Sequence, residues 1–490
     1  MRERGFGVVV LVAVGALAGA CASREYNSPQ AALADVTNRD LNYRTRTQAV
    51  PAALEGADGD ARRAALRALE DVAWDPTEHA TLRSAALRTL LEDPASAERV
   101  RARAADVLPR ERSREVVLNL CTMAADRGWK ELRPAIVQSF ARPVKGVPDD
   151  ERSELRALRA LGGDAARTTF DLFVESAAAS TTDPETGAAG NADARALRFR
   201  RDAWEVLSRL DASGEQRRRW VGELPPASAG DVEVLQRGLR EWRVLPLTAE
   251  QLDWQASLAS APDAWSQGRA ALEMFGDTPV SLRHASAAIW ARTHAPDLAG
   301  LSRQELLDRL ASRLRGRTQY GRSAETSDRR APERLEQVRD RLSKADLVHV
   351  LAVDNAVRDP AVVHALFGHA RLDQADESTE YGGLIAWEAG GPRAVLYQPR
   401  LAERAGDTTF VAPAEMLRAG DWSLAHYHFH VQNWRRSEYA GPSEADLAYC
   451  TRYGRACVVF TAIREGTLGV DYYQPGGVVV DLGTIELAGL

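Results

Sequence analysis

The run Trp422-Ser-Leu-Ala-His-Tyr-His-Phe-His430 places three of the chain's nine histidines within five residues. Its alternating pattern is typical of a β-strand, in which residues i, i+2 and i+4 point to one face. His426, His428 and His430 are therefore expected on the same side of one strand. Neutral imidazoles crowded on a buried face need partners for their ring nitrogens, and a divalent metal is the common partner. A metal-free, hydrogen-bonded or pH-sensitive histidine cluster is the alternative.

The residues after this strand supply a carboxylate at the start of a helix. In Gly441-Pro-Ser-Glu-Ala-Asp-Leu-Ala-Tyr449, Ser443 and Asp446 have the spacing of a helix capping box. Two histidines and one carboxylate would leave a fourth tetrahedral position for water, which is the pattern of catalytic zinc. Such a site also needs a general base. Glu380 is the candidate, because an isolated carboxylate at the start of an apolar strand is unfavourable unless it has a functional role or a partner.

This order of residues resembles the JAMM, or MPN-plus, metallopeptidases: a glutamate at the start of a strand, then His-x-His, then Ser-x-x-Asp at a helix start. The resemblance covers residues 340–490 and is strongest from Gly441 to Phe460. It implies a Zn²⁺ site in which two histidines and the aspartate bind the metal, the glutamate activates water and the serine supports the oxyanion. The residues carried over are His428, His430, Asp446, Glu380 and Ser443.

One alternative concerns which histidines bind the metal, because His426 and His428 would also satisfy His-x-His. The later pair is preferred because it lies nearer the loop that leads to Asp446. His426 would then support the ligands or face the substrate. The implied activity is zinc-dependent hydrolysis of an amide bond, by a peptidase or isopeptidase acting on a cell-envelope peptide or protein tail. The alternative function is a non-catalytic lipoprotein scaffold that binds protein partners through helical repeats.

The N-terminus resembles a bacterial lipoprotein signal. Two arginines precede the apolar run Val8–Ala20, which is too short to span a bilayer, and Cys21 follows directly. Residues 1–21 are therefore expected to be a signal peptide that ends at a lipidated Cys21. The protein would be lipid-anchored to a membrane of the cell envelope, and Ala22 after the cysteine favours the outer membrane in a Gram-negative cell.

A long stretch rich in helix-forming residues follows this signal. Residues 22–44 are expected to be a linker, and residues 45–335 an α-helical region. Ala64–Leu69, Ser84–Leu91 and Ala102–Leu108 resemble one another and recur about twenty residues apart, which is typical of stacked helix pairs such as HEAT repeats. A non-repetitive helical bundle is the alternative. The net charge of −6, without a basic block, argues against a nucleic-acid partner.

Strands dominate after residue 380, interrupted by helices expected at Pro413–Arg418 and Ser443–Tyr453. A mixed sheet with flanking helices makes residues 340–490 an α+β domain, so an all-α region followed by an α+β domain is predicted. The expected strands are Gly383–Glu388, Ala394–Gln398, Thr408–Ala412, Trp422–His430, Cys457–Ile463, Leu468–Tyr473 and Val478–Leu482.

Overall fold

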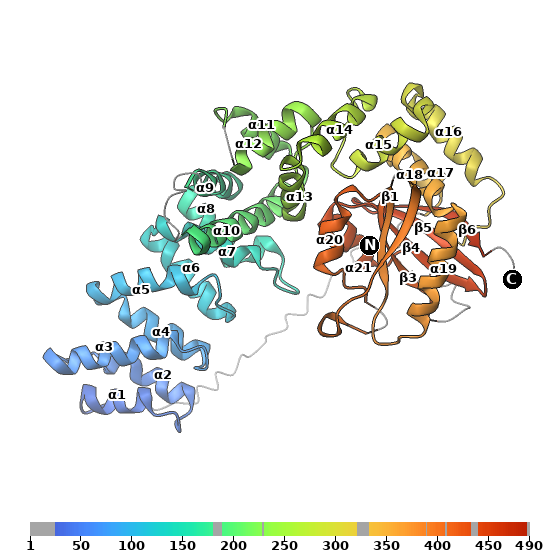
Figure 1. Cartoon of the computed structure of the whole chain (residues 1–490). Helices are drawn as coiled ribbons and strands as arrows, with labels where there is room; N and C mark the ends of the chain where they lie inside the picture. The colour runs from blue at the N-terminus through green and yellow to red at the C-terminus, as the bar shows by residue number, and fades with distance from the viewer. Residues whose placement is uncertain are drawn as a thin grey trace, which may run out of the picture. The chain divides into compact units, whose positions relative to one another are not determined.

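The computed structural model describes residues 25–179, 189–227, 230–320, 333–388, 390–406, 409–432 and 440–487. The described chain is helical as far as Gln374, and a mixed sheet with further helices follows (Figure 1). The predicted order, a helical region before an α+β domain, is confirmed. The chain forms two compact units, residues 1–163 and residues 164–490. Among the described helices, none is both long enough and apolar enough to cross a membrane.

The N-terminal unit is built from helices that contact one another in sequence order, α1 with α2, α3 with α4 and α7 with α8 (Figure 1). Helix α1 and the start of α2 fall within residues 22–44, where a linker was expected. The Ser28 hydroxyl accepts the N–H of Ala31 and caps α1, and Pro29 occupies its first turn. The helices are α1 (Pro29–Thr37), α2 (Tyr43–Ala52), α3 (Gly59–Trp74), α4 (Ala80–Leu90), α5 (Pro94–Val107), α6 (Arg114–Arg127), α7 (Arg133–Ala141) and α8 (Ser153–Gly162).

A buried arginine recurs near the start of the second helix in three of these helix pairs, as the fourth residue of α2 and α4 and as the N-cap of α8. Each guanidinium donates to the carbonyl of the penultimate residue of the preceding helix, where the helix leaves carbonyls without intrahelical partners. The bonds run from Arg46 Nε to Val36 O (2.9 Å), from Arg83 Nε to Ala73 O (3.1 Å) and from Arg152 Nη1 to Phe140 O (2.9 Å). Each arginine also pairs with a buried glutamate, respectively Glu78, Glu111 and Glu154. The pairs α1–α2, α3–α4 and α7–α8 therefore share one plan.

Arg83→Met is expected to lower the free energy of unfolding by about 3–5 kcal/mol, because it leaves a buried carboxylate without its counter-charge. The side chains of Arg83 and Glu111 are only 2% and 6% exposed. Burial opposes ionisation of Glu111, but its bonds to Arg83 and to the backbone N–H of Ser113 together outweigh burial and lower its pKa. Denaturant unfolding of the full chain measures the loss. The exposed pair Arg63–Asp60 supplies the control, and equal losses from Arg83→Met and Arg63→Met would contradict a role for burial.

The C-terminal unit begins with helices that continue the chain toward the sheet. Among them, α18 and α19 contribute apolar side chains to the same large core as the strands. Within this unit the helices before the sheet are α9 (Ala165–Ala179), α10 (Ala189–Leu210), α11 (Glu215–Glu223), α12 (Gly230–Arg237), α13 (Ala249–Ala259), α14 (Pro262–Leu272), α15 (His284–His294), α16 (Arg303–Leu314), α17 (Leu335–Val338), α18 (Lys344–Val357) and α19 (Pro360–Gln374).

The sheet has the order β2-β1-β3-β4-β5-β6, in which β3 and β4 are parallel and the other neighbours antiparallel. The strand expected at Thr408–Ala412 is wrong, since residues 409–412 are described and are not extended in a sheet. They lead into α20 (Ala414–Ala419), and the Phe410 ring stacks on His428 instead. The strands are β1 (Gly382–Glu388), β2 (Gly391–Tyr397), β3 (Ala425–His430), β4 (Cys457–Arg464), β5 (Thr467–Gln474) and β6 (Val478–Glu486).

The two faces of the sheet differ in chemistry. On one face Tyr427, Phe429 and Phe460 belong to a large apolar core shared with α18 and α19. On the other face α21 (Glu444–Tyr453) contacts β5, and Cys450 packs against strand residues in a smaller core. The histidines of β3 alternate with the aromatic residues of the large core, so they lie on the face that carries α21.

Candidate metal centre

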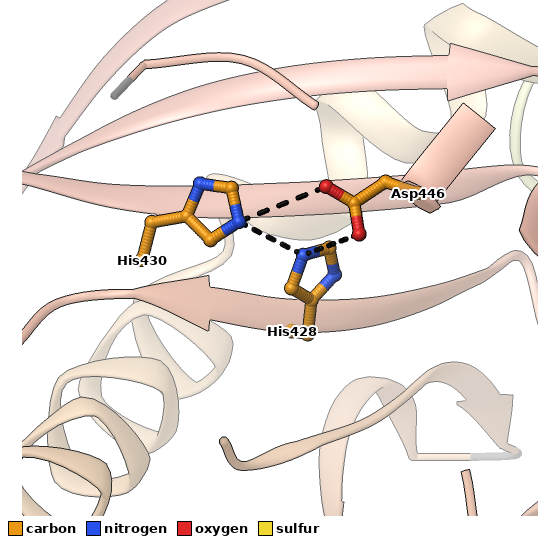
Figure 2. A group of neighbouring side chains, drawn as sticks. All are labelled: His428, His430 and Asp446. Carbon is orange, nitrogen blue, oxygen red and sulfur yellow. Dashed lines mark hydrogen bonds and ion pairs between the residues drawn. The ribbon is translucent and has the colours of Figure 1, made fainter. Parts of the chain in front are cut away.

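Strand β3 fixes the positions of the three histidines. His428 lies opposite Gly382 of β1 and Val459 of β4, in the interior of the sheet. Because β3 and β4 are parallel, the chain must cross over between them, and this crossover contains α21. The first turn of α21 thereby lies above the end of β3, beside His428 and His430 (Figure 2).

Asp446 completes a compact group with these two histidines, as Figure 2 shows. Its Oδ1 lies 3.2 Å from His428 Nε2, and its Oδ2 lies 3.7 Å from His430 Nε2. The two Nε2 atoms are 3.2 Å apart. A tetrahedral zinc ion with ligands at about 2.0–2.1 Å would hold its ligand atoms about 3.3–3.4 Å apart. The three side chains therefore have the spacing needed to hold one metal ion.

The capping box of α21 orients the carboxylate. The backbone N–H of Ser443 donates to Asp446 Oδ2 over 2.7 Å, and the N–H of Asp446 donates to Ser443 Oγ over 3.2 Å. The first bond restrains the Asp446 side chain on the side of the histidines. The second bond uses Ser443 Oγ as an acceptor, which leaves its hydroxyl hydrogen able to donate to another group.

The electrostatics of the site favour a positive charge between its side chains. Burial disfavours the imidazolium form of His428, but Asp446, aided by Glu380 and Asp373, outweighs burial and raises its pKa to about 9. Burial opposes ionisation of Asp446 in the same way, yet the two histidines hold its pKa well below the usual range. A proton thus supplies in the metal-free chain the positive charge that a bound cation would supply.

Glu380 lies beside this group but outside it. It is only 5% exposed and stands two residues before Gly382, the β1 residue opposite His428. Its negative charge is close enough to contribute to the raised pKa of His428. Asp373, at the end of α19, accepts the N–H of Tyr381 and so restrains the backbone next to Glu380. A buried carboxylate beside a ligand group, rather than within it, has the position of a proton acceptor.

His426 is not part of the ligand group. Its Nδ1 lies 2.8 Å from the hydroxyl of Tyr449, and its Nε2 has no hydrogen-bond partner among the described residues. A Cβ atom placed on Gly420 would come within 2.7 Å of this Nε2, so the ring is closely packed. Burial lowers the pKa of His426 well below the usual range. The alternative pair, His426 with His428, is not the pair that faces Asp446.

The sequence did not point to two aromatic residues that lie next to His428. The hydroxyl of Tyr473 on β5 lies 3.5 Å from His428 Nδ1, the ring nitrogen that points away from Asp446. Phe410 stacks on the same ring with its centroid 5.9 Å away. Such neighbours orient a metal-binding imidazole and keep water from it. No sequence signal singles them out, because each lies beside His428 only through the tertiary fold.

The predicted lipidation site, Cys21, lies outside the described residues. Comparisons of the chain with protein-family models, curated proteins and solved structures found no significant match.

Proposed function

We propose that the C-terminal unit is a zinc-dependent amide hydrolase of the JAMM type. One observation carries this proposal: His428, His430 and Asp446 meet at metal-binding distances, with the buried Glu380 alongside. The resemblance to the JAMM pattern assigns the same four residues. The group suits Zn²⁺ because it combines two imidazole nitrogens with one carboxylate oxygen and leaves room in the coordination shell.

Each of the remaining residues has a role in the proposed reaction. When bound, zinc would act as a Lewis acid and make water a nucleophile near neutral pH. Glu380 accepts the proton of the attacking water and delivers it to the leaving amine. The Ser443 hydroxyl, which already accepts a bond from the backbone of α21, donates to the developing oxyanion. Phe410 and Tyr473 shield the buried side of His428 from solvent.

The proposed substrate is a peptide or protein tail of the cell envelope. The lipoprotein-like signal at residues 1–21 supports this location, with Cys21 as the membrane anchor. The helix pairs of the N-terminal unit, which are HEAT-like in their repetition, would bind a protein partner or part of the substrate. A lipoprotein scaffold without catalysis is the second candidate, favoured only by those repeated helix pairs.

Metal content separates the two candidates. The protein purified without chelators is expected to contain one zinc per chain, measured by elemental analysis, since a scaffold has no reason to bind stoichiometric zinc. Removing the metal with a chelator should abolish amide hydrolysis and lower the thermal midpoint, because an ion that binds only the folded state stabilises it. Adding zinc back should restore both properties. A metal-free protein that takes up no zinc on addition would contradict the proposal.

A further inference from the structure

The N-terminal unit contains a cavity of about 550 Å³, far from the metal centre in sequence. The loop before α6, α6 itself, the segment after α7 and the start of α8 enclose it. Val117, Val144 and Val147 form part of an apolar lining, together with Leu118, which is 44% exposed. An exposed leucine at the wall of a cavity is a place where another apolar side chain can be buried.

Arginines without acidic partners surround this apolar lining. The side chains of Arg112, Arg114 and Arg156 line the cavity and are exposed, and within the described part of the chain none of them forms an ion pair. They differ from the buried arginines of the helix pairs, which are neutralised by glutamates. Three such cations around one cavity form a site for negative charge.

Arg142 adds a fourth cation to the same cavity. Its Nη2 donates to the carbonyl of Glu111 over 2.7 Å, a neutral acceptor, and its buried Nε has no hydrogen-bond partner among the described residues. The two buried glutamates of the lining are already engaged, Glu111 by Arg83 and Glu154 by Arg152. Burial lowers the pKa of Arg142, while the charge of Glu154 opposes this effect and the charge of Arg152 adds to it.

Two further carboxylates limit which anions fit. Glu115 and Glu151 also line the cavity, and Glu115 accepts a bond from Thr81 Oγ1 over 3.2 Å. Four unpaired arginines against two such glutamates leave a modest positive excess around an apolar lining. A polyphosphate backbone would meet both glutamates and gain nothing from the valines. An extended peptide that alternates acidic and apolar side chains matches both properties.

We propose that this cavity binds an acidic peptide segment of a partner protein, with carboxylates against Arg112, Arg114 and Arg156 and an apolar side chain against Leu118 and Val147. The site is independent of the metal centre. If the proposed hydrolase activity is correct, the cavity would hold a segment of the substrate or of a protein that delivers it. Binding of this segment would then explain why the chain carries the helix pairs together with the proposed hydrolase unit.

Fluorescence anisotropy of the full chain tests this site, with a labelled peptide Gly-Glu-Val-Asp-Leu-Glu-Gly as probe. Saturable binding is expected, which weakens as salt is added and is lost when lysines replace the acidic residues. Arg112→Glu and Arg156→Glu should each weaken binding at least tenfold, and Leu118→Ser should weaken it without changing the salt dependence. Arg67→Glu on α3 is the matched control. The substitution makes the same charge change, and Arg67 is exposed and lies outside the cavity.

Several outcomes would overturn the proposal. These are the absence of saturable binding, equal affinity for the lysine peptide, and a loss in Arg67→Glu equal to that in Arg156→Glu. Displacement of the probe by a single-stranded oligonucleotide more strongly than by unlabelled peptide would favour a nucleic acid over a peptide as the ligand. Peptide binding needs neither metal nor turnover. A failure to bind the peptide would therefore not contradict the hydrolase proposal, and a failure to detect hydrolysis would not contradict the peptide site.

Discussion

Glu380→Gln should slow amide hydrolysis by about 10²–10⁴-fold, the usual effect of losing a general base, while zinc content stays at one per chain. Gln keeps the shape of Glu but cannot accept the proton of the attacking water. The side chain is buried next to the ligand group without belonging to it, so the change removes proton transfer and leaves the ligands in place. Losing the charge of Glu380 weakens the attraction of the site for a proton and for a cation alike, but all three ligands remain, so zinc should stay bound.

The measurement compares turnover of a peptide substrate at matched zinc content and matched folded fraction. Glu377→Gln is the control, since Glu377 is exposed and lies three residues away on the same segment. It makes the same chemical change and should leave the rate unaltered. A Glu380→Gln protein that cleaves its substrate at the parental rate would rule out this residue as the base, whatever its metal content.

The histidine strand and the helix behind it are where the sequence predicts most. Alternation along residues 422–430 is a local property, and it correctly places His428 and His430 on one face. The Ser443–Asp446 spacing is also local, and the capping box forms as expected. The parallel pairing of β3 with β4 is not local, yet it brings these two pieces together. The JAMM-like order of the residues supplied that link.

Two expectations failed for different reasons, one because a tertiary contact overrides the local pattern and one although the local signal is present. Residues 408–412 have β-forming composition, but Phe410 packs on His428 and Pro413 begins the approach to α20, so the described part of this segment is not a strand. The expected linker at residues 22–44 contains α1, although Ser28 and Pro29 are a recognisable helix start. This helix start is a local signal, so α1 could have been predicted from the sequence.

The neighbours of the ligand group could not be predicted for a different reason. Tyr473 reaches His428 across β4, and Asp373 reaches the backbone next to Glu380 from another element. Both residues look like ordinary core or helix residues in the sequence. Their roles depend on the order of the strands and on the packing of α19, which no local spacing encodes.

Substitutions at His426, His430 and Asp446 should separate ligands from core residues. His430→Ala is expected to lower zinc affinity more than about 100-fold, beyond the effect typical of residues that only support a ligand. His430 is 15% exposed and His426 only 2%, so the metal-free His430→Ala protein should lose less stability than His426→Ala. His426→Ala should show the opposite pattern. It removes a packed ring and its bond to Tyr449, so it should lower the thermal midpoint while zinc stoichiometry is kept.

Asp446→Asn tests whether the carboxylate is a zinc ligand without removing the helix cap. The amide oxygen of Asn can still accept the N–H of Ser443, so α21 should begin at the same residue, whereas Asp446→Ala would lose that bond as well. A neutral amide is a poor zinc ligand, so affinity should fall as steeply as in His430→Ala. Calorimetric zinc titration and thermal unfolding, run on each variant, give the two readouts independently. Loss of zinc in His426→Ala with retention in His430→Ala would show that the metal is held by the earlier histidine pair, and the ligand set would have to be reassigned.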